Sequence, residues 1–160
     1  MAKTIRRSLV FLLSALGAGC GDEPGMMSAP DGVSVVLDEA TLENGRHAEV
    51  CRGAGSLSDM LNDVTRHELT MNGVMARMAE GNDPMRTDMM TGHACSEQGP
   101  AHMSQDLAET KAELATHAKQ MRAADNVGAG HYECSVHAHE LRNRLESMKD
   151  TWRSMSCTPR

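Results

Sequence analysis

Residues 58–78, with the sequence SDMLNDVTRHELTMNGVMARM, decide the fold. Six side chains, all apolar except one histidine, recur along this stretch at alternating steps of four and three: Met60, Val64, His67, Met71, Val74 and Met78. This spacing places them on one face of an α-helix, and Ser58 before Asp59 is typical of a helix N-terminus. We therefore expect a helix with one buried face that ends at Gly81 and Pro84.

Three other segments have the same helical periodicity. One covers about residues 36–51, one follows Pro100 and extends to about Ala124, and one runs from His131 to Met155. Short connections after the first and third helices make neighbouring helices antiparallel, so the sequence predicts an all-α protein, an up-down-up-down four-helix bundle. A long loop, residues 80–99, joins the second helix to the third, and such loops are uncommon unless they are functional or held in place.

The composition limits both the core and the partners. Aromatic residues are 2% of the chain and methionines number 14, so Met, Leu, Ala and Val must fill the core. The chain has 16 Lys and Arg against 22 Asp and Glu, a formal net charge of −6. Nucleic acid is therefore not an expected partner, because phosphate binding needs a basic face. Nothing in the sequence identifies a protein partner.

The N-terminal residues predict export. Lys3, Arg6 and Arg7 precede the apolar stretch at residues 9–16, LVFLLSAL, which is too short to span a bilayer. This pattern is typical of a signal peptide, assigned here to residues 1–19. The alternative for this region is an ordinary secretory peptide followed by an incidental cysteine.

Residues 16–20, LGAGC, resemble the lipobox of signal peptidase II substrates, in which small residues precede a cysteine. The family usually has Leu three residues before the cysteine, where this chain has Gly17. The resemblance implies that Cys20 receives fatty acyl chains such as palmitate and tethers a bacterial lipoprotein to a membrane, facing the periplasm. Gly21 is not the Asp of the inner-membrane retention signal, which favours the outer membrane. Residues 20–35 then form the acylated cysteine and a flexible linker, and residues 36–160 form the bundle domain.

Four further cysteines are expected to be oxidised in an exported protein. In the predicted bundle Cys51 and Cys134 lie at one end, whereas Cys95 and Cys157 lie at the other. Of the possible pairings, only Cys51–Cys134 with Cys95–Cys157 joins cysteines that lie at the same end of the bundle. The alternative is that Cys51 and Cys134 stay reduced and bind a metal together with His47, His131 and His137.

Each predicted helix carries one histidine with an acidic residue four positions earlier: Glu43 and His47, Asp63 and His67, Glu113 and His117, Glu133 and His137. The two histidines of each hairpin are 20 residues apart, a regularity that hints at a duplicated hairpin. At about 1.5 Å rise per residue the four histidines fall at nearly the same height in the bundle. Imidazoles and carboxylates in such layers suit zinc, copper, iron or manganese, so these eight residues form the predicted metal site.

Other interpretations of these pairs remain open. Acid and histidine four residues apart also form ordinary ion pairs on a helix surface. The sequence thus predicts a lipid-anchored envelope protein that binds a transition metal as a buffer, carrier or sensor. The alternatives are an envelope interaction or structural module without metal, and a di-metal oxidase or peroxidase.

Catalytic motifs are absent from the sequence. It contains no Gly-rich phosphate loop, no nucleophile elbow, no His-Glu-x-x-His zinc motif and no Cys-x-x-Cys-His haem motif. The di-metal carboxylate four-helix proteins are similar in architecture, but their Glu-x-x-His motif is missing here, and the hemerythrin-like motif cannot be aligned. The sequence therefore favours a protein that is not an enzyme.

Overall fold

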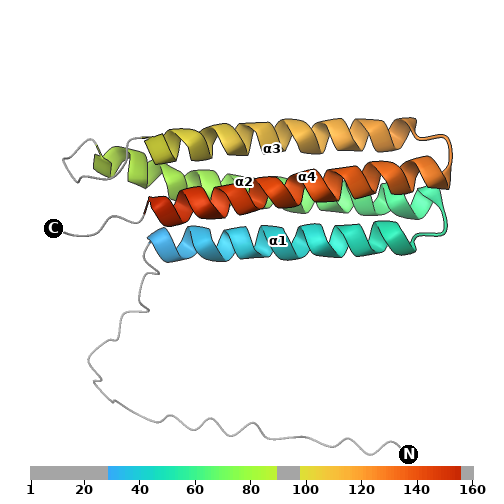
Figure 1. Ribbon diagram of the computed structural model, residues 1–160, viewed down its shortest axis with the longest axis horizontal. Helices are drawn as coiled ribbons and strands as arrows, with labels where there is room; N and C mark the ends of the chain where they lie inside the picture. The colour runs from blue at the N-terminus through green and yellow to red at the C-terminus, as the bar shows by residue number, and fades with distance from the viewer. Residues whose placement is uncertain (1–28, 90–97, 156–160) are drawn as a thin grey trace, which may run out of the picture.

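The computed structural model describes residues 29–89 and 98–155, which form four helices. They are α1 (Ala29–Gly53), α2 (Leu57–Met89), α3 (Gln98–Ala123) and α4 (Val127–Ser154). Figure 1 shows them lying side by side as an antiparallel bundle, in which α1 and α3 each pack against both α2 and α4. The predicted all-α, up-down-up-down bundle is confirmed.

Polar side chains define the start of two helices. The hydroxyl of Ser56 accepts a hydrogen bond from the backbone N–H of Asp59 at 3.1 Å and donates one to the Asp59 carboxylate at 2.7 Å. Ser56, and not the predicted Ser58, therefore caps α2. At the start of α4, the side chain of Asn126 accepts a hydrogen bond from the N–H of Ala129 at 2.9 Å. Such caps satisfy backbone donors that a helix leaves unpaired.

At the end of the bundle opposite the two short connections, the helices extend beyond their predicted ends. Helix α1 begins at Ala29, so the predicted linker at residues 20–35 is wrong over its last seven residues, where Val33 is a buried core residue. Helix α2 continues past Gly81 and Pro84 to Met89, and α3 begins at Gln98, so most of the predicted loop at residues 80–99 is helical. Tertiary packing overrides the local signals here.

Two contacts explain why α2 does not stop at Gly81. A Cβ atom on Gly81 would collide with the side chain of Val33, so glycine allows α1 and α2 to approach closely. The buried Asn82 amide donates hydrogen bonds to the Pro100 carbonyl and the Ser104 hydroxyl, both at 3.1 Å. These bonds hold the end of α2 against the start of α3.

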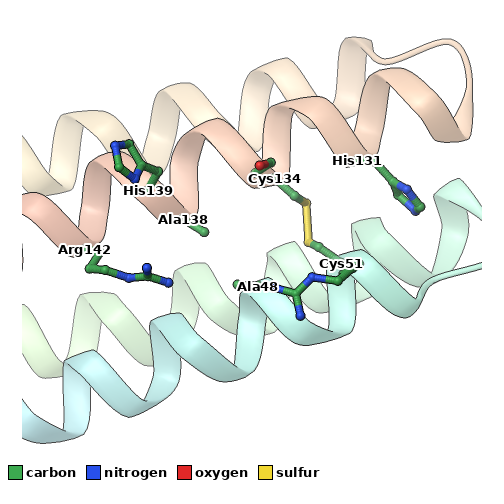
Figure 2. A pocket seen from close by; sticks show the side chains of 9 residues that line it. Ala48, Cys51, His131, Cys134, Ala138, His139 and Arg142 are labelled. Atoms are coloured by element: carbon green, nitrogen blue, oxygen red, sulfur yellow. A yellow bond between two sulfur atoms is a disulfide. The ribbon is translucent and has the colours of Figure 1, made fainter.

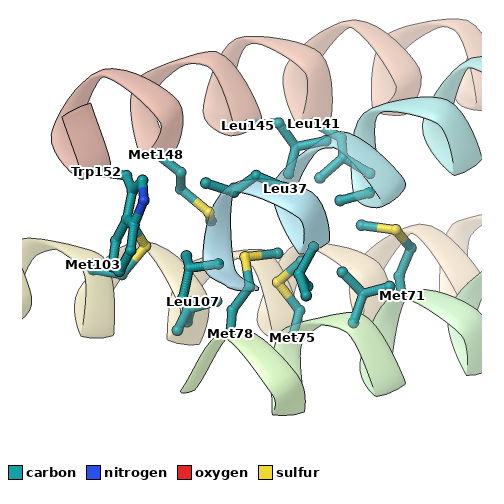
Figure 3. Close-up of a cluster of buried hydrophobic side chains, with 14 of the residues drawn as sticks. Leu37, Met71, Met75, Met78, Met103, Leu107, Leu141, Leu145, Met148 and Trp152 are labelled. Atoms are coloured by element: carbon teal, nitrogen blue, oxygen red, sulfur yellow. The ribbon is translucent and has the colours of Figure 1, made fainter. Parts of the chain in front are cut away.

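The core consists of two apolar clusters separated along the bundle axis. The larger one is rich in methionine and leucine, with Trp152 near one end (Figure 3). The smaller one lies near the short connections and contains Cys51, Met60, Val64, Ala118, Met121 and Cys134. The expectation that methionine fills this core is confirmed. Between the two clusters the interior is polar, and that interruption contains the candidate site.

Several predictions fall outside the described residues: the signal peptide at residues 1–19, the acylated Cys20, and the Cys95–Cys157 bridge. Among the four described helices, none combines the length and apolar character that a membrane crossing requires.

Candidate metal centre

Four histidines, one from each helix, meet between the two apolar clusters and form the histidine layer: His47, His67, His117 and His137. Their exposed fractions are 0%, 1%, 3% and 4%. The rings stack in two pairs, His47 on His67 and His117 on His137, each with ring centroids 4.0 Å apart. Rings of different pairs meet at interplanar angles of 73–80°. The structure thus brings the four predicted histidines into one compact cluster.

The Nε2 atoms of this layer converge across the diagonals of the bundle. Nε2 of His47 on α1 lies 3.3 Å from Nε2 of His117 on α3. Nε2 of His67 on α2 lies 3.4 Å from Nε2 of His137 on α4. Each ring therefore presents one nitrogen to the centre and turns the other toward the outside of the bundle.

In the first hairpin, formed by α1 and α2, acidic residues contact the outward-facing nitrogens of the histidine rings. Each acid contacts the histidine of the other helix in the hairpin. Nδ1 of His47 lies 2.7 Å from the Asp63 carboxylate, and Nδ1 of His67 lies 3.0 Å from that of Glu43. The acids therefore pair with histidines across α1 and α2, and not with the histidine four residues later on the same helix. The two carboxylates orient the imidazoles from outside the layer.

Two arginines hold these carboxylates in place. Arg46 donates hydrogen bonds to Glu43 at 2.7 Å and to Asp63 at 2.6 Å. Arg66 donates to Asp63 at 2.7 Å. Each carboxylate is thus in an ion pair with a guanidinium group. The sequence analysis missed both arginines, although a signal was present, because each directly precedes the histidine of its helix.

The second hairpin, formed by α3 and α4, repeats only part of this arrangement of histidine, carboxylate and arginine. Nδ1 of His137 faces the Glu113 carboxylate at 3.5 Å, and Arg144, also missed from sequence, donates to Glu113 at 3.1 Å. Nδ1 of His117 is buried and has no hydrogen-bond partner in the described part of the chain. Glu133 instead lines a cavity of about 230 Å³ together with His117. Of the four predicted acids, Glu133 is the one for which we find no contact with the layer.

Hydrogen bonding fixes the tautomer of two rings. An ionised carboxylate only accepts hydrogen bonds, so Nδ1 of His47 and Nδ1 of His67 must be the donors. The Nε2 atoms of these two neutral rings then carry lone pairs that point into the layer. Orienting an imidazole by a carboxylate on its far nitrogen is the usual arrangement behind metal-binding histidines.

Burial holds His47, His67 and His117 in the neutral form that metal binding requires. Burial lowers the pKa of His47 from 6.5 to about 4, although Asp63 opposes this shift. Burial, and then repulsion from neighbouring imidazoles, places the pKa of His67 and that of His117 well below the ordinary value. Neutral imidazole is the ligand form, so protons compete weakly for these nitrogens near neutral pH.

The spacing of the layer matches a tetrahedral ion. Nitrogen ligands at about 2.0–2.1 Å from such an ion lie about 3.3–3.4 Å from one another. The two diagonal Nε2 separations are 3.3 and 3.4 Å. His47, His117 and His137 each place a ligand nitrogen within 4.8 Å of those of the other two, and His67 does not belong to that closer group. The described residues can therefore hold a metal ion with nitrogen ligands.

A disulfide lies next to the layer. Cys51 and Cys134 are joined as predicted, linking α1 to α4 beside a groove of about 420 Å³ (Figure 2). The Cys51 sulfur is 3.7 Å from Nε2 of His47. Within the described chain, the oxidised pair does not provide the thiolates of the alternative site. His131 contacts the Ala54 carbonyl instead, at 3.1 Å.

Comparisons of the chain with protein families, curated proteins and solved structures give no significant match. The geometry of the centre is therefore the basis for its proposed chemistry.

Lowering the pH should destabilise the metal-free protein. An unfolded imidazole ionises near pH 6.5, whereas the buried His47 does so only near pH 4. Between these values the unfolded state binds more protons, so stability is full above about pH 6.5 and falls by about 1.4 kcal/mol per pH unit for each such histidine. Urea unfolding of chelator-treated protein between these pH values measures this slope. His67→Gln should make it shallower, and His139→Gln, at an exposed position, should not; equal slopes for both variants contradict the account.

Proposed function

We propose that this protein is a lipid-anchored protein of the bacterial cell envelope that binds one transition-metal ion through His47, His67, His117 and His137, as a buffer, carrier or sensor. The observation that carries the proposal is that four buried imidazoles meet in one layer, with Nε2 atoms 3.3 and 3.4 Å apart across the two diagonals, the separation between two ligands of a tetrahedral ion. Nε2 of His47 and Nε2 of His67 already point lone pairs into the layer, because Nδ1 of each ring donates to a carboxylate.

The donor set favours particular metals. Four neutral nitrogens suit zinc or copper, whereas magnesium and calcium prefer oxygen ligands. The carboxylates Glu43, Asp63 and Glu113 orient the rings from outside, as supporting groups do in known metal sites. Zinc or copper is therefore the expected ion, with iron a weaker candidate.

A complete nitrogen shell also bears on catalysis. Catalytic zinc sites keep an open position for water or substrate, and closed four-ligand sites are structural. Four histidines around one ion leave no such position. This favours storage, transport or sensing over the oxidase or peroxidase alternative.

The location in the envelope is supported by the N-terminal sequence. The basic residues, the short apolar stretch and LGAGC at residues 16–20 resemble a lipoprotein signal, with Cys20 as the acylated residue. A lipid anchor would hold the bundle at the membrane surface, on the periplasmic face, and Gly21 favours the outer membrane.

Metal binding is tested with the purified protein, without a polyhistidine tag. Isothermal titration with zinc and with copper should give one ion per chain, with a dissociation constant below about 10 μM. Bound metal should raise the melting temperature by mass action. His67→Ala and His117→Ala should each weaken binding at least about tenfold, because each removes one of four ligands. His139→Ala is the matched control and should bind like the parent; no binding by the parent, or equal binding by all variants, would mean that the layer is structural.

The anchor is tested separately in cells. Cys20→Ser should abolish incorporation of labelled palmitate and leave the precursor uncut, because both steps need the cysteine sulfur. Cys157→Ser keeps the N-terminal signal and should be acylated normally. Recovery of a mature, unacylated parent protein would contradict lipid anchoring without affecting the metal proposal.

A further inference from the structure

The two hairpins are related by an offset of 70 residues, which allows them to be compared position by position. The offset joins His47 with His117 and His67 with His137, and both diagonal contacts have this separation. It also joins the acids Glu43 with Glu113 and Asp63 with Glu133. At the positions of Arg46 and Arg66, however, the second hairpin has Thr116 and Val136. The first hairpin is therefore closed by arginines, whereas the second has no basic residue at the corresponding positions.

An acidic cavity lies on the side of the second hairpin. It has a volume of about 230 Å³ and is lined by Glu113, Glu133 and Glu140 together with His117 and His137 of the histidine layer. A neighbouring hollow of about 470 Å³ shares Glu113 and Glu140 and adds Asp106. The α3–α4 face thus places carboxylates between solvent and two of the four imidazoles, together with Arg144, which lines the outer hollow and is paired with Glu113.

Hydrogen bonding within the histidine layer makes Nδ1 of His117 a free acceptor. Nε2 of His47 carries a lone pair, because Nδ1 of that ring donates to Asp63. The 3.3 Å contact between the two Nε2 atoms then requires His117 to carry its proton on Nε2. Its Nδ1 is left as a buried lone pair without a partner on the side of the acidic cavity. Glu113, which lines the same cavity, faces Nδ1 of His137 at 3.5 Å and is paired with Arg144 at 3.1 Å.

We propose that the acidic cavity is a capture site for divalent transition-metal ions, formed by Nδ1 of His117 with the carboxylates of Glu113 and Glu133. This proposal rests on the four-histidine centre of the proposed function, for which it supplies the route of entry. Carboxylates attract and partly neutralise the arriving cation, and the imidazole lone pair selects a transition metal over calcium or magnesium.

Transfer to the centre changes the tautomer of His117. As the ion moves inward, Nε2 of His117 becomes a ligand and releases its proton to water, and Nδ1 takes up one proton in exchange. Nε2 of His137, which donates to Nε2 of His67, makes the same exchange, so that the net number of protons is unchanged. Nδ1–H can then donate to Glu133, the counterpart of Asp63, which completes the symmetry of the layer. Because His117 serves either position in turn, one ion is bound per chain.

The experiment measures the rate at which Co²⁺ reaches the centre, because tetrahedral Co²⁺ absorbs strongly in the visible region. In stopped-flow mixing with the metal-free protein, Glu133→Gln should load about tenfold more slowly than the parent, the scale of a charge-lined cleft's effect on association. Glu49→Gln removes the same charge from an exposed position on α1 and should load within about twofold of the parent. Equal rates for the two variants would overturn the capture site.

A second variant installs the missing arginines. Thr116→Arg combined with Val136→Arg copies the closed hairpin onto the open one and should also slow loading, because the guanidinium groups would occupy the carboxylates. Loading as fast as the parent would again overturn the proposal. The amount of Co²⁺ bound at equilibrium is measured separately, and no bound Co²⁺ in the parent would contradict the proposed function itself.

Discussion

The convergence of four imidazoles in a buried layer is the constraint on which the rest of the structure depends. Polar rings at 0–4% exposure are costly to bury unless their nitrogens have partners. The outward nitrogens of the first hairpin meet carboxylates, and those carboxylates meet arginines that reach the surface. The inward nitrogens meet one another across the diagonals, and under the proposed function a shared cation would bind all four.

The apolar clusters on either side of the layer fix the geometry of this centre. They exclude water and hold the helices at the distance at which the Nε2 atoms meet. Methionine supplies much of that packing, and its flexible side chain adapts to the gaps that a polar layer leaves in a core. The disulfide between Cys51 and Cys134 fixes α1 against α4 next to the layer. The centre is thus prepared before any ligand arrives, which reduces the ordering cost of binding.

Helical periodicity was enough to predict the bundle, the position of the histidine layer and the Cys51–Cys134 pair. Spacing alone could not predict which histidine each acid serves. A step of four residues places Glu43 and His47 on one helix face, but the neighbouring antiparallel helix brings His67 within hydrogen-bond distance of Glu43. Which contact forms depends on rotamers and on the distance between helices.

Helix ends were predicted less well, for a related reason. Gly81 and Pro84 are local stop signals, yet α2 continues because Val33 packs against Gly81 and Asn82 bonds to the start of α3. Contacts between distant segments decide these residues, and a single-sequence pattern does not contain them. The arginines of the first hairpin could have been found, since Arg46 and Arg66 each stand three residues after an acid and directly before a histidine.

X-ray absorption spectroscopy of the zinc-loaded protein tests the central claim most directly, because it reports the atoms bound to the ion. The account predicts four nitrogen ligands at about 2.0–2.1 Å, with the outer-shell scattering of imidazole rings and no sulfur. A shell of five or six oxygen ligands, or one that contains sulfur, would contradict a four-histidine centre.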